Sequence, residues 1–325
     1  MDIIKIKGIG IVFAIIIMLF SPTTLGLLGD GQAYGNDNDI IDKSKVEDKT
    51  IKLYITSTGN TVEMDLEDYI CQVLMSEVPA SFNIEALKAM AVAARSYVLR
   101  RCESEEKYTK HFSCDVCDDY THCLGYISKE DAEIMYGKET AFEYHQKIKE
   151  AVMETKGEVL YYDNNIADTV FHASSYKKTE SAKNIWGFDV PYLVSVSSTE
   201  ETQKSNVEFS LDEFDEILKK EGILCDFSGD ENGFIGEIKD NESGRVEYVE
   251  IGGRKITGRR VREILGLKST CFDVKYNNSS FSFEVKGNGH GVGMSQLGAN
   301  SFAESGKNYK EILMHYYSGT KLGVY

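Results

Sequence analysis

Small side chains dominate the stretch "IEALKAMAVAARSYVLRR" at positions 84 to 101. Its apolar residues recur at the three- and four-residue spacing of a helix. Alanine side chains let a neighbouring element approach such a helix closely. The stretch therefore predicts a buried helix, whose first turn Ser81 or Asn83 can cap.

A lone carboxylate, Glu77, stands just before this helix, in "SEVPAS". Asp65, followed three residues later by Asp68, resembles a capping box for an earlier helix that runs to about Glu77. Val78-Pro79 ends that helix, because the residue before a proline avoids the helical region. Glu77 is thus predicted to sit in a tight corner between two helices. The alternative is a helix-end carboxylate in a surface ion pair.

Elsewhere, helical and hairpin patterns are separated along the chain. Hairpins are predicted over residues 51–65, 157–175, 233–253 and 271–287, and one further strand over 191–198. Helices are predicted over 129–155 with a break near Gly137, over most of 200–235, after a Thr257 cap, and over 309–319. Separation without regular β-α-β alternation predicts an α+β fold, with a helical corner packed on mainly antiparallel β-hairpins. We expect one domain over 49–325, with a smaller subdomain inserted at about 195–285.

The first 48 residues have a different character. Lys5 and Lys7 precede a segment without charge from Gly8 to Gly29. About twenty uncharged residues are enough to cross a bilayer, and a cationic start also fits a secretory signal. We expect an uncleaved transmembrane anchor over 1–29, with a cleaved signal as the alternative, and an acidic linker over 30–48. Both alternatives place the remaining chain outside the cytoplasm.

The net charge of −16 argues against nucleic-acid binding, which requires a basic face. One basic run, Arg254 to Arg262, interrupts this acidic sequence. It is either a solvated helix face or a contact for carboxylates of a substrate or partner.

Cysteine and histidine gather in "HFSCDVCDDYTHCLGY". The segment contains five potential ligands for zinc, which are His111, Cys114, Cys117, His122 and Cys123. Zinc in structural sites takes four such ligands in a tetrahedron, and an odd total of seven cysteines suits a metal site better than a framework of disulfides. The alternatives are free thiols or a disulfide between Cys114 and Cys123.

Glycines surround His290 in "KGNGHGVGMSQLGANSFAESG", at positions 286 to 306. Such a density of glycine lets a backbone approach a ligand or adopt positive φ. The spacing fits neither a phosphate-binding loop nor the serine nucleophile elbow, because Leu297 stands where that elbow requires glycine. The alternative is a tight turn around a core histidine.

This glycine motif, together with "HYYSG" and the upstream "SEVPASFNIEALKAMAVAARSY", resembles the stage II sporulation protein D family. The wider family includes amidase enhancers of bacterial cell walls. The resemblance runs from about Ile51 to the last residue. It implies a membrane-anchored lytic transglycosylase that cuts peptidoglycan between N-acetylmuramic acid and N-acetylglucosamine. Glu77 would act as both acid and base and leave a 1,6-anhydro end, so no second carboxylate is needed.

The resemblance also implies roles for further residues. Substrate-binding roles are expected for Arg95, Ser96, Tyr97, His172, Ser174, His290, Ser295 and Gln296. A structural zinc ion is expected on His111, Cys117, His122 and Cys123, with Cys114 as a substitute ligand. One departure concerns Tyr176-Lys177-Lys178, which stand where the family usually has glycines. Bulky residues at that turn put the shape of the cleft edge in doubt.

The resemblance extends to the cellular setting. It implies thinning of septal peptidoglycan during engulfment, from the mother-cell membrane, in partnership with the amidase stage II protein P and the membrane scaffold stage II protein M. The rival hypothesis is a non-catalytic protein that grips glycan and stimulates an amidase. A zinc hydrolase is disfavoured, since thiolate-rich closed sites are usually structural.

Overall fold

The structure, a computed structural model, describes residues 46–103 and 114–325. The predicted anchor, nearly all of the predicted linker and the predicted ligand His111 lie outside these ranges. Within them, no helix is both long and apolar enough to span a membrane. The described chain is α+β, with helices and mainly antiparallel strand pairs, as the sequence predicts.

Two helices form the predicted corner. Helix α1 spans Leu66–Glu77, and its first N–H groups are capped by the Asp65 side chain, which accepts from Glu67 N and Asp68 N. Val78 then adopts an extended conformation and ends the helix. Helix α2 spans Ile84–Glu103, with the Asn83 carboxamide oxygen accepting from Glu85 N. Both predicted helices and the break between them are confirmed.

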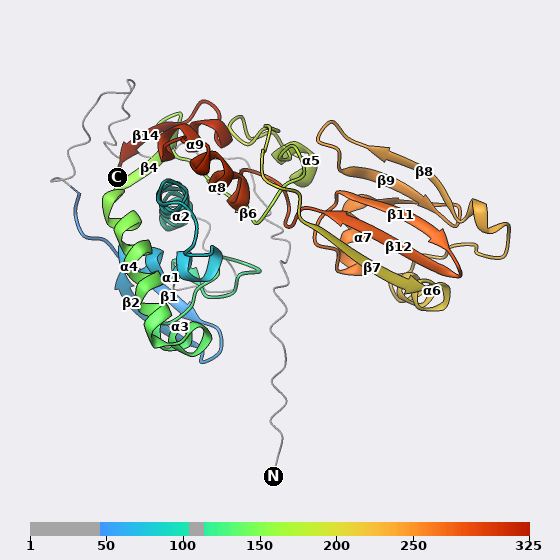
Figure 1. Ribbon diagram of the computed structural model, residues 1–325, viewed down its shortest axis with the longest axis horizontal. Coiled ribbons are helices and arrows are strands. Elements are labelled where there is room, and N and C mark those ends of the chain that lie inside the picture. The colour runs from blue at the N-terminus through green and yellow to red at the C-terminus, as the bar shows by residue number, and fades with distance from the viewer. Residues whose placement is uncertain (1–45, 104–113) are drawn as a thin grey trace, which may run out of the picture.

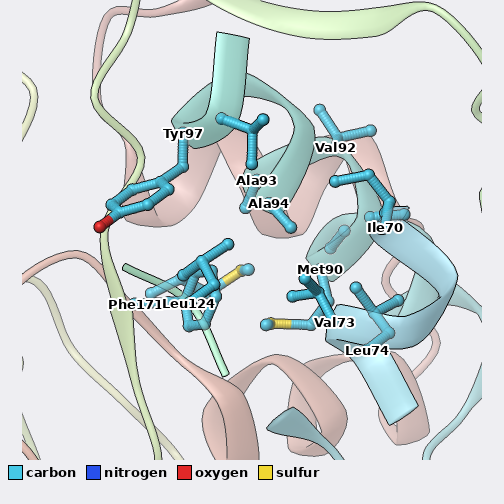
Figure 2. Packing of buried hydrophobic residues seen from close by; sticks show 14 of the residues in the cluster. Ile70, Val73, Leu74, Met90, Val92, Ala93, Ala94, Tyr97, Leu124 and Phe171 are labelled. Carbon is cyan, nitrogen blue, oxygen red and sulfur yellow. The ribbon is translucent and has the colours of Figure 1, made fainter. Parts of the chain in front are cut away.

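Helix α2 lies at the centre of the first body of the fold, where it contacts α1, α4, α8, α9 and β4 (Figure 1). Its alanines are fully buried, which allows neighbours on several sides. Figure 2 shows this packing, with Val73 and Leu74 of α1 facing Met90 of α2. The elements around α2 are β1 (Thr50–Ile55), β2 (Asn60–Asp65), β3 (Val116–Cys117), α3 (Lys129–Tyr136), α4 (Lys138–Glu154), β4 (Glu158–Tyr162), β5 (Asn165–Ile166), β6 (Phe171–His172), α5 (Ala182–Trp186), β13 (Met294–Ser295), α8 (Gln296–Glu304), α9 (Tyr309–Tyr316) and β14 (Lys321–Val324).

A second hydrophobic core is built from residues 214 to 285. Two three-stranded sheets, ordered β10-β9-β8 and β11-β12-β7, carry it together with two helices (Figure 1). The elements are β7 (Lys204–Ser210), α6 (Leu211–Lys220), a 3-10 turn (Glu231–Gly233), β8 (Ile235–Asp240), β9 (Val246–Ile251), β10 (Arg254–Thr257), α7 (Gly258–Leu265), β11 (Phe272–Asn277) and β12 (Ser280–Lys286). This core falls inside the range predicted for an inserted subdomain, whose bounds stay a prediction.

One local prediction was wrong, and two were right only in part. Residues 191–198 do not form a regular strand, and Ser197 alone among them makes an isolated bridge, with Lys178. The charged segment 200–235 contains strand β7, because Val207 and Phe209 alternate with polar residues and face the second core. The 157–175 hairpin is confined to β4 and β5, since β6 pairs in parallel with β13 instead.

Candidate functional site

Glu77 is the last residue of α1, and its carboxylate accepts two hydrogen bonds from segments distant in sequence. The backbone N–H of Gly125 donates to Oε1 at 2.8 Å. The Gln296 side chain, at the start of α8, donates from Nε2 to Oε2 at 3.2 Å. Three separate parts of the chain therefore meet at this one acid, and Gln296, which was expected to line the cleft, contacts it.

The backbone at Gly125 passes so close to Glu77 that any side chain at position 125 would displace neighbouring side chains. A Cβ added at this position would lie 2.8 Å from Ser76 Oγ and 3.0 Å from Glu77 Oε1. Its φ is not positive, so the requirement is space and not backbone conformation. The preceding residue, Leu124, is buried among the apolar residues of the helical corner and anchors this segment (Figure 2). The sequence analysis did not predict a role for Gly125. Its position just after the cysteine cluster, between Leu124 and Tyr126, could have indicated a close backbone contact.

Burial raises the pKa of the Glu77 carboxyl above its ordinary value, since desolvation disfavours the charged form. The hydrogen bonds from Gly125 and Gln296 oppose this rise because they stabilise the carboxylate. Buried Val78 and Phe82 supply apolar surroundings. The residue as a whole nevertheless remains partly exposed. This combination suits a group that alternates between acid and base.

The two histidines of the predicted cleft use both ring nitrogens inside the protein. His290 Nδ1 accepts from Val292 N at 3.0 Å, so its Nε2 carries the proton and donates to Phe171 O at 3.0 Å. His172 lies 3.2 Å from Val292 O through Nδ1 and 2.6 Å from Ser175 Oγ through Nε2. Burial lowers the pKa of His290 to about 3 and that of His172 well below its ordinary value. Both imidazoles are neutral and hold the glycine-rich loop together.

The two serines predicted to bind substrate are buried. Ser295 Oγ donates to Glu200 Oε1 at 2.6 Å and accepts from Gly298 N at 3.2 Å, which caps helix α8. Ser174 Oγ donates to Gln203 at 3.2 Å. Ser295 therefore fixes the helix whose first residue, Gln296, reaches Glu77. Glu200, which sequence reasoning did not single out, supports that cap.

The predicted substrate residues on α2 lie in the interior. Arg95 is fully buried and pairs in a bidentate manner with Glu67, at 2.9 Å from Nε to Oε1 and 2.6 Å from NH2 to Oε2. Ser96 donates to Val92 O and accepts from Leu160 N. Tyr97 is 1% exposed, and the Arg101 guanidinium lies 3.2 Å from its ring centroid. A side chain buried to this extent does not touch a polymer in this conformation, so we carry no substrate role further for these three.

Cys117, His122 and Cys123 form a compact potential metal site, with their ligand atoms all within 4.8 Å of one another. His122 Nδ1 lies 3.4 Å from Cys117 Sγ and 3.5 Å from Cys123 Sγ. A tetrahedral zinc ion with usual bond lengths separates a sulfur and a nitrogen ligand by about 3.5 Å, so the geometry fits. The Cys117 side chain lowers the pKa of the Cys123 thiol, which favours the thiolate that binds metal. Cys114 is not part of this group, and its sulfur lies 3.0 Å from Thr61 Oγ1.

The departure at 176–178 produces a strained turn. Lys177 has a φ of 62°, which favours glycine and is unusual for a bulky residue. Its ammonium lies 4.9 Å from the Tyr176 ring centroid, and that of Lys286 lies 5.2 Å from it. Cation–π contacts therefore surround the tyrosine where the family usually has glycines.

The basic run on β10 and α7 is engaged within the protein. Arg254 donates to Leu224 O, Arg259 pairs with Glu263, and Arg260 pairs with Glu221. Arg262 is buried and donates to Leu267 O. These contacts favour the solvated helix face over a carboxylate-binding surface.

Sequence comparisons identify relatives of this chain. Residues 54–162 match the family described as "Stage II sporulation protein". The chain is 34% identical over 283 residues to "Stage II sporulation protein D" of Bacillus subtilis (strain 168), covering 86% of this chain and 80% of that protein. The protein of the same name from Bacillus amyloliquefaciens is also 34% identical, over 278 residues, covering 84% and 78%. "Amidase enhancer" of Bacillus subtilis (strain 168) is 27% identical over 305 residues, covering 78% of this chain and 40% of that protein.

Proposed function

The chain belongs to the stage II sporulation protein D family, and from that premise we propose that it is a lytic transglycosylase acting on the glycan strands of peptidoglycan. Its substrate would be the bond between N-acetylmuramic acid and N-acetylglucosamine, in strands from which stem peptides have been removed. The observation that carries the proposal is the position of Glu77, a partly exposed residue whose carboxyl group has a raised pKa and is held by two donors.

The proposed reaction needs one acid and no water. Protonated Glu77 gives its proton to the oxygen that bridges the two sugars, and the bond from that oxygen to muramic C1 breaks. The Glu77 carboxylate then takes the proton of the muramic C6 hydroxyl, and O6 bonds to C1. Glu77 ends protonated again, and the products are a 1,6-anhydromuramic end and a free N-acetylglucosamine hydroxyl.

The hydrogen-bond donors at Glu77 and the burial of its carboxyl group together suit the two proton transfers of this reaction. The Gly125 and Gln296 N–H groups stabilise the carboxylate that forms after the first proton transfer. Desolvation favours the protonated acid that begins it. The proposed mechanism uses Glu77 alone as acid and base, whereas ordinary glycosidases use two carboxylates.

The test compares the wild-type protein with Glu77→Gln on glycan strands stripped of stem peptides. The products are separated and weighed by mass spectrometry. We expect wild-type fragments one water lighter than hydrolysis products, and no new ends with the variant. Fragments of ordinary hydrolytic mass, or equal cleavage by the variant, would contradict the proposal.

The alternative function is a glycan-binding enhancer of a cell-wall amidase. The similarity to a protein named "Amidase enhancer" favours it. In this case neither the wild type nor Glu77→Gln would produce new glycan ends, and both would increase the rate of a partner amidase on intact peptidoglycan. The same preparations distinguish the two functions.

We propose further that the protein acts on septal peptidoglycan during engulfment, anchored in the mother-cell membrane through residues 1–29. Its proposed partners are the amidase stage II protein P, which would supply peptide-free strands, and the scaffold stage II protein M. An alkaline phosphatase fused after residue 48 should be active outside the cytoplasm, and affinity purification from sporulating cells should recover both partners.

Zinc, where bound, would be held by Cys117, His122 and Cys123, and we propose His111 as the fourth ligand. The ion would supply cross-linking and no chemistry. Cys123 lies two positions before Gly125, so this cluster would fix the segment whose N–H holds Glu77.

A further inference from the structure

Trp186 is the only tryptophan in the sequence, and the proposed reaction assigns it no role. It ends the short helix α5, after which Gly187 adopts a φ of 83° and turns the backbone. This turn brings Phe188 beside it, with ring centroids 6.1 Å apart and ring planes inclined by 22°. The two side chains are partly exposed. Together they form a nearly parallel aromatic pair, which we call the Trp186 platform.

The Trp186 indole N–H has no hydrogen-bond partner within the part of the chain that the structure describes, and it is not among the buried polar atoms without a partner. Indole nitrogen acts only as a donor. A buried indole N–H usually finds a partner, and this one is instead left available at the surface. The platform thus presents apolar ring surface next to a free donor.

The platform contacts both hydrophobic cores. Trp186 and Ile185 pack against the first core. From the segment of the second core, Arg259 of α7 donates to Ile185 O at 3.0 Å and Ser243 Oγ donates to Glu180, just before α5, at 2.7 Å. Glu180 also accepts from Asn184 Nδ2 at 2.9 Å. Little conformational entropy is therefore lost when a ligand binds, which is the condition for an effective preformed site.

The platform also lies on the scaffold that serves Glu77. The Trp186 ring centroid is 6.2 Å from that of His290, in the same glycine-rich loop that leads into Gln296. Only six positions separate His290 from the residue that donates to the catalytic carboxylate. One glycine-rich loop therefore contacts Trp186 through His290 and reaches Glu77 through Gln296.

We propose that Trp186, with Phe188, is a second glycan-binding site that grips the strand away from the cleaved bond. The C–H groups on one face of an N-acetylated sugar would stack on the negative face of the ring, and the indole N–H would donate to an acetamido or hydroxyl oxygen. Two simultaneous contacts along one strand raise the overall affinity for polymer without a change at the catalytic acid. This inference rests on the proposed function only in taking a glycan as the ligand.

The test uses the fact that tryptophan emission reports on Trp186 alone. N-acetylglucosamine oligomers and peptide-free glycan strands are titrated into the Glu77→Gln protein, which binds without cutting. We expect a saturable change of emission at lower concentration for strands than for oligomers. An emission spectrum that stays constant while binding is detected by another method would overturn the site.

Variants give a second readout. Trp186→Ala should weaken co-sedimentation with insoluble peptidoglycan about tenfold, while Phe142→Ala, which removes a 65% exposed aromatic on α4, should not. Trp186→Phe retains a ring without the donor and should lose less, and it replaces the alanine variant if that fails to fold. Equal sedimentation of wild type and Trp186 variants would refute the site.

The two proposals fail in different ways. If the protein cuts strands but Trp186 emission does not change on binding, the transglycosylase proposal is supported and the glycan site at Trp186 is refuted. If the protein cuts nothing but Trp186 emission changes saturably, the glycan site is supported and the transglycosylase proposal is refuted.

Discussion

The backbone N–H of Gly125 donates to the carboxylate of Glu77 across 48 positions of sequence, at 2.8 Å. This contact joins the segment of the cysteine cluster to the end of helix α1. The N–H stabilises the charged acid, and the backbone of Gly125 lies so close to Glu77 that an added Cβ would press on its carboxylate. Several expected outcomes depend on it and on the neighbouring contact from Gln296.

Gly125→Ala should reduce strand cleavage by roughly 10- to 100-fold, because displacement of a catalytic group by about 1 Å has effects of this size. The added methyl group would push the Glu77 carboxylate and the Ser76 hydroxyl aside. Gly229→Ala is the matched control, since nothing lies within 4 Å of its added Cβ and its φ is not positive. Product release is followed by mass spectrometry. Full activity of Gly125→Ala would contradict the placement of Glu77.

Gln296→Met should move the alkaline limb of the activity profile to higher pH. The Gln296 N–H stabilises the carboxylate, so its loss raises the pKa of Glu77 further, and the acid form persists to higher pH. The measurement is kcat/KM against pH. Ser301→Ala on the same helix serves as control, because its hydroxyl makes only marginal contacts of 3.3 and 3.4 Å. A shift toward lower pH would be the opposite of the expected sign.

Glu77→Gln should unfold at higher denaturant concentration than the wild type at neutral pH. A carboxyl with a raised pKa binds a proton more tightly in the folded state, so its ionisation destabilises the fold. The difference should be absent well below the ordinary pKa of 4.5 and grow as the pH rises through the folded-state value. Urea unfolding at several pH values measures it. A difference that shrinks with rising pH would show that burial does not control this group.

Cys117→Ser should abolish stoichiometric zinc binding, as measured by native mass spectrometry of the purified protein. The loss of one thiolate leaves two described ligands, too few for a closed site. Cys225→Ser, which alters a half-buried cysteine of the second core, should retain one zinc ion. If both variants bind zinc equally, Cys117 is not a zinc ligand and the metal binds at another site.

Arg95→Met should destabilise the protein by about 3–5 kcal/mol, because it leaves the buried Glu67 carboxylate without its partner. Removing both charges with Arg95→Met and Glu67→Gln should cost less than the single change. Urea unfolding measures the free energy of unfolding of the single and the double variant. A single variant of normal stability but raised KM for glycan would restore a substrate role for Arg95.

The sequence was informative where local chemistry decides the structure. Asp65, Asn83 and Thr257 cap the helices that they were expected to cap, since each offers a short polar side chain to the first turn. The turn at Asp163 and Asn164 has the positive φ values that join β4 to β5. These features depend on a few neighbouring residues.

Contacts between distant segments were harder to predict. The residue type of Arg95 suggested a ligand-binding cation, but its partner Glu67 lies 28 positions away in another helix. The histidines looked like substrate contacts, and only the fold shows that backbone groups occupy both nitrogens of His290. Gln296, by contrast, was assigned to the cleft and does reach Glu77.

Glu77 and Gln296 are 219 positions apart, with the whole second core between them. A chain synthesised from its N-terminus presents the acid long before the helix that completes its surroundings. On the proposed function, a nascent or truncated chain that lacks α8 would carry Glu77 without its donor Gln296. Because the residues around Glu77 come from both ends of the domain, the protein would cut the cell wall only after the entire domain has emerged and folded.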